Sequence, residues 1–137
     1  MIGALFVSMA LPFFGADSAV VSNLSPLQWR LVLMLCVLVP VLEELVFRGL
    51  IQGYFRNWVW ARGGWVGITA ANLLTSLLFV LMHWLTRDGL TAMLVVLPSI
   101  YLGVVRDRIS SLSMCVLIHI LWNLTWYLTP WLWQTLQ

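Results

Sequence analysis

Two adjacent carboxylates, Glu43 and Glu44, stand in the stretch VPVLEELVFRGL with apolar residues on both sides. An ionisable side chain inside an apolar span costs about 2.5–3.5 kcal/mol to insert into a bilayer, which makes it a functional candidate. Arg48 follows Glu44 by four residues, a spacing that places both on one helix face. We therefore predict that Arg48 pairs with Glu44 while Glu43 turns to another face for chemistry. The alternative is a structural Glu44–Arg48 pair with Glu43 reaching solvent.

The two histidines of the chain, His83 and His119, lie in different apolar runs. One buried histidine by itself is more often a packing residue that hydrogen-bonds another helix. Asn123 follows His119 by four residues, so the two share a helix face and can donate toward one point. The alternative for Asn123 is an interhelical hydrogen bond. Together with Glu43, this set can supply a general base, its partner and oxyanion donors.

Other kinds of site have weaker patterns. Ser113 and Cys115 precede His119, but no strained nucleophile turn surrounds them. No histidine is followed by glutamate, so the HExxH pattern of zinc proteases is absent from the sequence. Two histidines and a glutamate could hold zinc, but we expect no metal or other cofactor. We expect no nucleic-acid partner, because the basic residues form no stripe.

The composition is that of an integral membrane protein. Hydrophobic residues make up 62% of the chain and charged residues 9%, with a mean hydropathy of +0.98. Soluble domains carry about 25% charged residues. We therefore predict an all-α, multi-pass bundle in the lipid bilayer, with about five transmembrane helices at ~20 residues each.

The apolar runs and the breaks between them predict one membrane domain over residues 1–137. Residues 1–25 form a weak first span and a loop, and residues 26–134 form a catalytic core of four helices. Pro40 is a predicted kink in the first helix of this core. The four core helices are predicted at 26–55, 65–85, 90–105 and about 113–133, with a charged turn at 106–108.

Arginines account for all seven basic residues and mostly lie between the apolar runs. If all five spans cross, the side that carries the N-terminus also carries Arg56, Arg62, Arg106 and Arg108. Arg30 and Arg87 then lie on the opposite side. Because arginine is enriched on the inner side of a membrane, the N-terminus is predicted to be inside.

These residues also resemble a known family in their identity and order. The segment from Glu43 to Gly49, EELVFRG, resembles the EExxFRG signature of the CPBP family. That family groups type II CAAX prenyl endopeptidases with bacteriocin-processing and Abi proteins. Residues 79–83 match its FxxxH motif, residues 119–123 match its HxxxN motif, and residues 101–113 are similar to a weaker third region.

The resemblance implies a glutamate-dependent intramembrane endopeptidase that needs no metal. It implies that Glu43 activates water with assistance from His83, and that His119 and Asn123 stabilise the tetrahedral oxyanion. Glu44 and Arg48 match supporting positions of the family.

Larger members of the family carry several additional helices before the paired glutamates, whereas here we expect at most one. Helices that position the substrate are then missing or supplied by a partner chain or an oligomer, which puts prenylated substrates in doubt. Small bacterial members resemble peptidases that process C-terminal membrane anchors or bacteriocin-type peptides, so a membrane-associated protein or peptide is the expected substrate. The resemblance to these members also implies the inner membrane of a bacterial cell as the location.

Two functions of other classes remain open from the sequence. One is a catalytically idle, Abi-like membrane scaffold that uses the same polar cluster for packing or partner binding. The other is a proton-coupled transporter, since glutamate and histidine also serve as proton relays within membranes. The small number of spans and the lack of an inverted repeat argue against the transporter.

Overall fold

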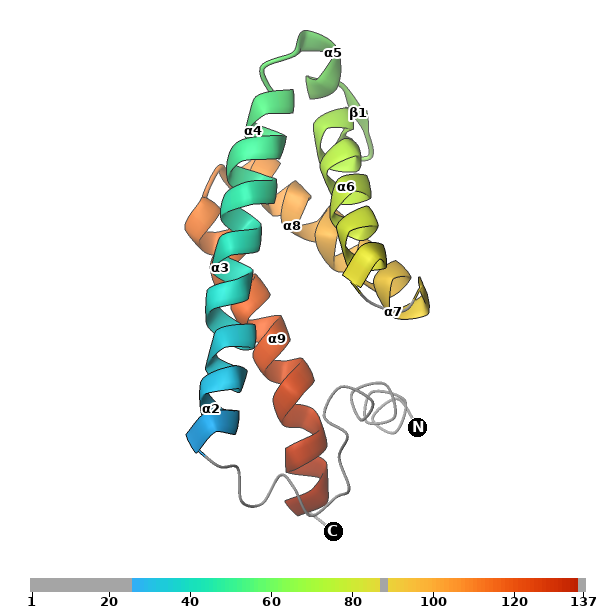
Figure 1. Ribbon diagram of the computed structural model, residues 1–137. Coiled ribbons are helices and arrows are strands. Elements are labelled where there is room, and N and C mark those ends of the chain that lie inside the picture. Colours follow the sequence, from blue (N-terminus) through green and yellow to red (C-terminus); the bar gives the residue numbers. More distant parts are fainter. Residues whose placement is uncertain (1–25, 87–88, 136–137) are drawn as a thin grey trace. The chain divides into compact units, whose positions relative to one another are not determined.

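The computed structural model of the protein describes residues 26–86 and 89–135 (Figure 1). Apart from one short hairpin, the elements of these residues are helices, which confirms the predicted all-α class. The predicted weak span and loop at 1–25 lie outside the described residues.

The first helical stretch runs without a break over residues 26–55, as predicted, but it is not a uniform α-helix. Two π-helical segments divide it. Its successive elements are α2 (Pro26–Leu33), η2 (Met34–Leu38), α3 (Val39–Glu44), η3 (Leu45–Ile51) and α4 (Gln52–Phe55).

Pro40 explains the first π-helical segment. Proline has no backbone N–H, so the helical hydrogen bond that residue 40 would donate is missing. Immediately before it, the Val39 N–H bonds to the oxygen of Met34, five residues back. A π-helical turn therefore precedes Pro40, and the kink predicted there stays a prediction. In η3, the Gln52 N–H likewise bonds to the oxygen of Phe47.

A hairpin replaces the start of the second predicted core helix. After α5 (Val59–Arg62), strands β1 (Gly64–Trp65) and β2 (Ile68–Thr69) pair antiparallel, with Trp65 opposite Ile68. Val66 and Gly67 form the turn and both have positive φ, 54° and 79°. Positive φ at both central residues is the geometry of a type I′ hairpin turn. The helix predicted from residue 65 therefore begins only at residue 70.

Three further helices follow, namely α6 (Ala70–Thr86), α7 (Gly89–Leu94) and α8 (Val96–Ile109), before the final α9 (Leu112–Thr135). The charged turn predicted at 106–108 is wrong, because these residues form the last turn of α8. Arginine is favourable there, at the negative end of the helix dipole. The helix ends at Ser110, which has a φ of 57° and bonds its N–H to the oxygen of Arg106.

Judged by length and apolarity, no helix within the described residues qualifies as a membrane span, in contrast to the five that were predicted.

The chain divides into two compact units, Met1–Pro40 with His119–Gln137, and Val41–Ile118. In the second unit α6 packs against α8, and both contact η3 (Figure 1). A small apolar core of Leu102, Val105 and Cys115 joins α8 to the start of α9. The single domain over 1–137 stays a prediction.

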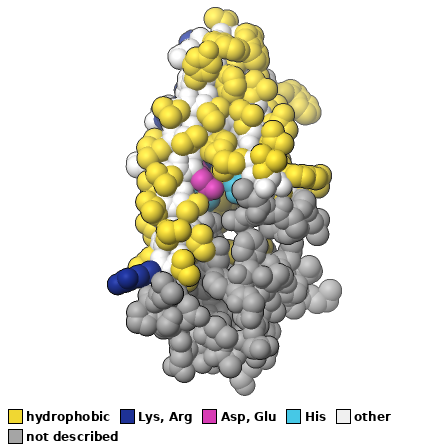
Figure 2. Space-filling model, viewed as in Figure 1, with side chains coloured by type: hydrophobic (Ala, Val, Ile, Leu, Met, Phe, Trp, Pro, Cys, Tyr) yellow, Lys and Arg dark blue, Asp and Glu magenta, His cyan; other side chains and the backbone are white. Residues whose placement is uncertain are grey.

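The second unit has polar groups inside and apolar groups outside. Side chains with at most 1% exposure include Glu44, Arg48, Gln52, Asn72 and Ser99. Large apolar side chains of the same helices point outward instead, with exposures of 69% for Leu50, 79% for Leu85 and 75% for Leu97. Hydrophobic side chains accordingly cover most of the described face that Figure 2 shows.

Candidate active site

Glu43 and His83 lie next to each other in the second unit. Glu43 is near the end of α3 and His83 is on α6, and Oε1 of the glutamate lies 3.7 Å from Nε2 of the histidine. The two side chains are only 14% and 8% exposed. In Figure 2, acidic and histidine side chains meet within a face that is otherwise apolar.

The backbone fixes the tautomer of His83. Its Nδ1 lies 2.9 Å from the carbonyl oxygen of Phe79, one turn earlier on α6. A carbonyl oxygen can only accept, so Nδ1 carries a proton and donates it. Nε2 is therefore the nitrogen that faces Glu43. The separation of 3.7 Å is longer than a direct hydrogen bond and suits a bridging water.

Aromatic packing holds the His83 ring in place. The ring of Phe79 lies beside it, with 4.3 Å between centroids. Phe79 also meets Phe47 edge to face at 4.9 Å, and the guanidinium carbon of Arg48 lies 4.9 Å from the Phe79 centroid. One phenyl ring thus contacts the histidine and the arginine.

Glu44 points to a different set of partners. Its Oε1 accepts a hydrogen bond of 3.0 Å from Nη1 of Arg48, and neither side chain has any exposed surface. Nη2 of Arg48 donates to the carbonyl and hydroxyl oxygens of Ser99, at 2.8 Å each. The ion pair predicted from the i, i+4 spacing is present, and it ties η3 to α8.

Further buried polar residues, which the sequence analysis did not single out, extend this network toward one end of the unit. Nε2 of Gln52 donates to the Gly103 oxygen at 3.0 Å and to Oδ1 of Asp107 at 2.9 Å. Nδ2 of Asn72 donates to the Ile100 oxygen at 3.0 Å. Gln52 lies one turn after Arg48, so its helical spacing from the arginine could have indicated that it faces the same buried network.

Gly103 permits the close approach of α6 and α8. A Cβ atom at this position would collide with the side-chain amide of Asn72. Glycine at position 103 therefore leaves room for the Asn72 amide between the two helices.

His119 and Asn123 lie on α9 in the first unit, one turn apart and on one face, as predicted. His119 is 9% exposed. Nδ2 of Asn123 donates to the carbonyl oxygen of Leu35 at 3.2 Å. The structure brings Glu43 and His83 together within the second unit, and it places His119 and Asn123 in the first.

The hydrogen bond of Asn123 has a local cause in the sequence. In the π-helical pattern of η2, the Leu35 carbonyl would accept from residue 40, which is proline and has no N–H. The N–H of Val39 is already bonded to Met34. Asn123 supplies the missing donor, and its amide carries a second N–H. The interhelical bond and an oxyanion role are therefore compatible.

Cys36 and Cys115 are both buried and carry free thiols. Sγ of Cys115 lies 3.5 Å from the Leu102 oxygen. Among the described residues, no three His, Cys, Asp or Glu side chains gather closely enough to hold a metal ion.

A family model described as type II CAAX prenyl endopeptidase Rce1-like matches residues 25–125, well over half of the 137 residues. The chain belongs to this family. The match confirms the resemblance seen in the motifs, and the matched range of this CAAX endopeptidase-like chain contains each predicted site residue. It makes the chain a member of a protease family. No curated protein and no solved structure matches it.

Proposed function

We propose that the protein is a multi-pass membrane endopeptidase, of the bacterial inner membrane, that uses Glu43 and His83 to activate water. The observation that carries this proposal is the pairing of these two side chains. Oε1 of Glu43 lies 3.7 Å from Nε2 of His83, and both side chains are nearly buried. The hydrogen bond between Nδ1 and the Phe79 carbonyl leaves Nε2 facing Glu43. A carboxylate and an imidazole in this arrangement can pass a proton between them.

The proposed reaction begins with a water molecule between Glu43 and His83. The pair takes one proton from the water, and the resulting hydroxide forms a bond to the carbonyl carbon of a peptide. The developing oxyanion accepts hydrogen bonds from His119 and Asn123, a role that the motif order supports. The C–N bond then breaks, and the proton held by the pair is delivered to the leaving nitrogen. No metal takes part in this sequence.

The lipid bilayer is the proposed environment because of what the second unit exposes. Its helices bury an ion pair and several amides and turn leucine, valine and tryptophan outward. In water, so large an apolar surface would be a liability for a monomer. The proposed substrate is correspondingly a membrane-associated or C-terminally anchored protein or peptide, which reaches the site within the bilayer.

Cleavage of a defined probe by the purified full-length chain tests the reaction. The probe is a set of peptides with one apolar C-terminal segment, reconstituted with the protein in liposomes and analysed by mass spectrometry. Glu43→Gln should lower kcat about 10²–10⁴-fold, the usual contribution of a positioned acid or base. Thermal unfolding should remain at the parent temperature, because Glu43 is not part of the buried ion pair.

Ser113→Ala and Cys115→Ala are the matched controls, since they remove the alternative nucleophiles near His119. Both should retain activity. Cleavage by Glu43→Gln at the parent rate would overturn the proposed mechanism. Loss of activity in Cys115→Ala with a folded chain would point instead to a thiol nucleophile.

A further inference from the structure

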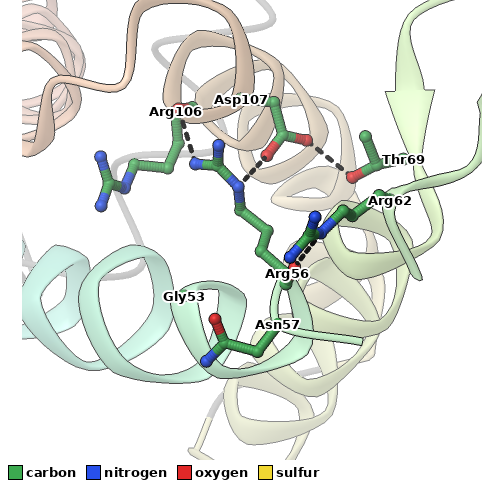
Figure 3. Close-up of a pocket in the computed structure, with 7 residues that line it drawn as sticks. All are labelled: Gly53, Arg56, Asn57, Arg62, Thr69, Arg106 and Asp107. Carbon is green, nitrogen blue, oxygen red and sulfur yellow. Dashed lines mark hydrogen bonds and ion pairs between the residues drawn. The ribbon is translucent and has the colours of Figure 1, made fainter. Parts of the chain in front are cut away.

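A positively charged pocket lies at one end of the second unit, apart from the residues of the proposed reaction (Figure 3). Its volume is about 570 Å³. Sites for small molecules typically enclose about 300–1,000 Å³. Three of the lining residues are arginines and one is an aspartate. The full lining consists of Gly53, Arg56, Asn57, Arg62, Thr69, Arg106 and Asp107.

The single carboxylate of the pocket is already committed to the fold. Oδ1 of Asp107 accepts from Gln52 at 2.9 Å, and Oδ2 accepts from the Thr69 hydroxyl at 2.7 Å. Nε of Arg56 lies 3.6 Å from the same Oδ1. The carboxylate can offset one guanidinium at most, so the lining keeps an excess of positive charge.

The arginine guanidinium groups differ in how many hydrogen bonds they donate within the protein. Nε of Arg106 donates to the Arg48 oxygen and Nη1 donates to the Ser110 oxygen, and its guanidinium turns away from Arg56 in Figure 3. Arg62 uses only Nε, which donates to the Arg56 oxygen at 2.7 Å. Within the described part of the chain, both terminal nitrogens of Arg62 have no hydrogen-bond partner. A guanidinium with two parallel N–H groups to offer matches the oxygens of a phosphate.

Exposed tryptophans accompany these arginines along the chain. Trp58 and Trp60 lie between the lining residues Asn57 and Arg62, and they are 40% and 58% exposed. Trp65 follows on β1 and is 85% exposed. Exposed tryptophan beside arginine is typical of the headgroup level of a membrane. A phosphate in this setting belongs to a lipid more readily than to a solute.

We propose that this pocket binds the phosphate group of an anionic phospholipid headgroup, with Arg62 as its principal ligand. The excess positive charge favours an anionic headgroup over a zwitterionic one. The site would anchor the α4–α5 end of the unit at the membrane surface, and it does so whether or not the chain cleaves peptides.

The test uses the purified full-length protein in detergent and its tryptophan fluorescence. Short-chain phosphatidylglycerol, short-chain phosphatidylcholine and inorganic phosphate are titrated in parallel. Phosphatidylglycerol should bind saturably and phosphatidylcholine more weakly. Arg62→Gln should weaken phosphatidylglycerol binding by at least about tenfold, the value of one charged hydrogen bond. Arg62→Lys keeps the charge but loses the two parallel N–H groups of the guanidinium. Its affinity for phosphatidylglycerol should lie between those of Arg62→Gln and the parent chain.

Arg30→Gln is the matched control, because Arg30 is also exposed and belongs to the first unit. It removes the same charge outside the pocket and should change affinity by about twofold or less. Since Arg62 is exposed, its variants should keep the parent circular dichroism spectrum and unfolding temperature.

Several results would overturn the proposal. Unchanged binding in Arg62→Gln would exclude the pocket, and equal losses in Arg62→Gln and Arg30→Gln would indicate diffuse charge. Equal affinity for the two lipids would exclude recognition of an anionic headgroup. Inorganic phosphate that binds as tightly as phosphatidylglycerol would indicate a free anion as the ligand. None of these readouts depends on protease activity.

Discussion

Glu43 and Glu44 are neighbours on α3, and they face different partners. Glu44 has no exposed side-chain surface and meets the guanidinium of Arg48 at 3.0 Å. Glu43 keeps 14% of its side chain exposed and lies 3.7 Å from the imidazole of His83. The arginine is held in turn by Ser99, whereas the histidine is held by its own helix.

The difference lies in what each partner can do with a proton. A guanidinium does not release its proton in proteins, so the Glu44–Arg48 pair holds a fixed charge and a fixed geometry. An imidazole gains and loses a proton near neutral pH, so the Glu43–His83 pair can transfer one. We therefore expect changes around Glu44 to lower stability first and changes around Glu43 to lower activity first.

Arg48→Met is the substitution expected to have the largest effect on stability. It leaves the Glu44 carboxylate buried without its cation. It also removes the guanidinium that donates hydrogen bonds to Ser99. Breaking a buried ion pair in this way typically costs about 3–5 kcal/mol. Thermal unfolding in detergent, followed by circular dichroism, should show a much lower transition temperature than for Glu43→Gln.

The double variant Glu44→Gln with Arg48→Met serves as the control for Arg48→Met. It removes both charges, so no uncompensated ion stays buried, and stability should partly return. An Arg48→Met protein that unfolds at the parent temperature would contradict the structural role of this pair.

Asn123→Ala tests whether this α9 residue acts mainly in catalysis or mainly in stability. As an oxyanion donor, Asn123 should be worth about 10²–10³-fold in kcat. Its hydrogen bond to Leu35 should be worth only about 0.5–1.5 kcal/mol of stability. A peptide cleavage assay and thermal unfolding of the same preparation separate the two roles. A modest loss of stability with unchanged kcat would leave Asn123 as a packing residue alone.

Much of the second unit could be predicted from the sequence, because its costly residues are few. Glu43, Glu44 and Arg48 stand out against an apolar background, and helical spacing alone predicts which glutamate the arginine meets. In the first unit, the missing N–H of Pro40 marked a place where the helix was expected to depart from regular geometry, and the π-helical segment η2 lies just before it. Such features depend on residues within one or two turns of each other.

The missed features depend on less local properties. Trp65 and Val66 are apolar, so the sequence predicted a helix that already began at residue 65. In the structure these residues belong to a hairpin whose two-residue turn has positive φ. The charges at 106–108 indicated a turn but are stabilising at the end of a helix. Gln52 and Asn72 are uncharged, so their burial against α8 left no signal in composition or charge. Which polar side chains pair across helices could be seen only in the structure.

Phe79→Leu is expected to have the smallest effect. It tests the link between the Glu43–His83 pair and the Glu44–Arg48 pair. The phenyl ring contacts the His83 imidazole and the Arg48 guanidinium, so it couples the proton-transfer pair to the ion pair. Leucine retains apolar volume but loses the flat surface against the imidazole. Because small displacements of a catalytic group cost up to about 100-fold, we expect kcat to fall roughly tenfold, with KM nearly unchanged.

Phe47→Leu provides the matched comparison for Phe79→Leu, since Phe47 meets Phe79 edge to face. Each variant should lose about 0.5–1.5 kcal/mol of stability with this aromatic pair. Only Phe79→Leu should also lose kcat, because only it removes the ring that lies against His83. Equal losses of kcat in the two variants would mean that the aromatic cluster supports the helices in general. His83 would then be oriented chiefly by its hydrogen bond to the Phe79 carbonyl, which neither substitution removes.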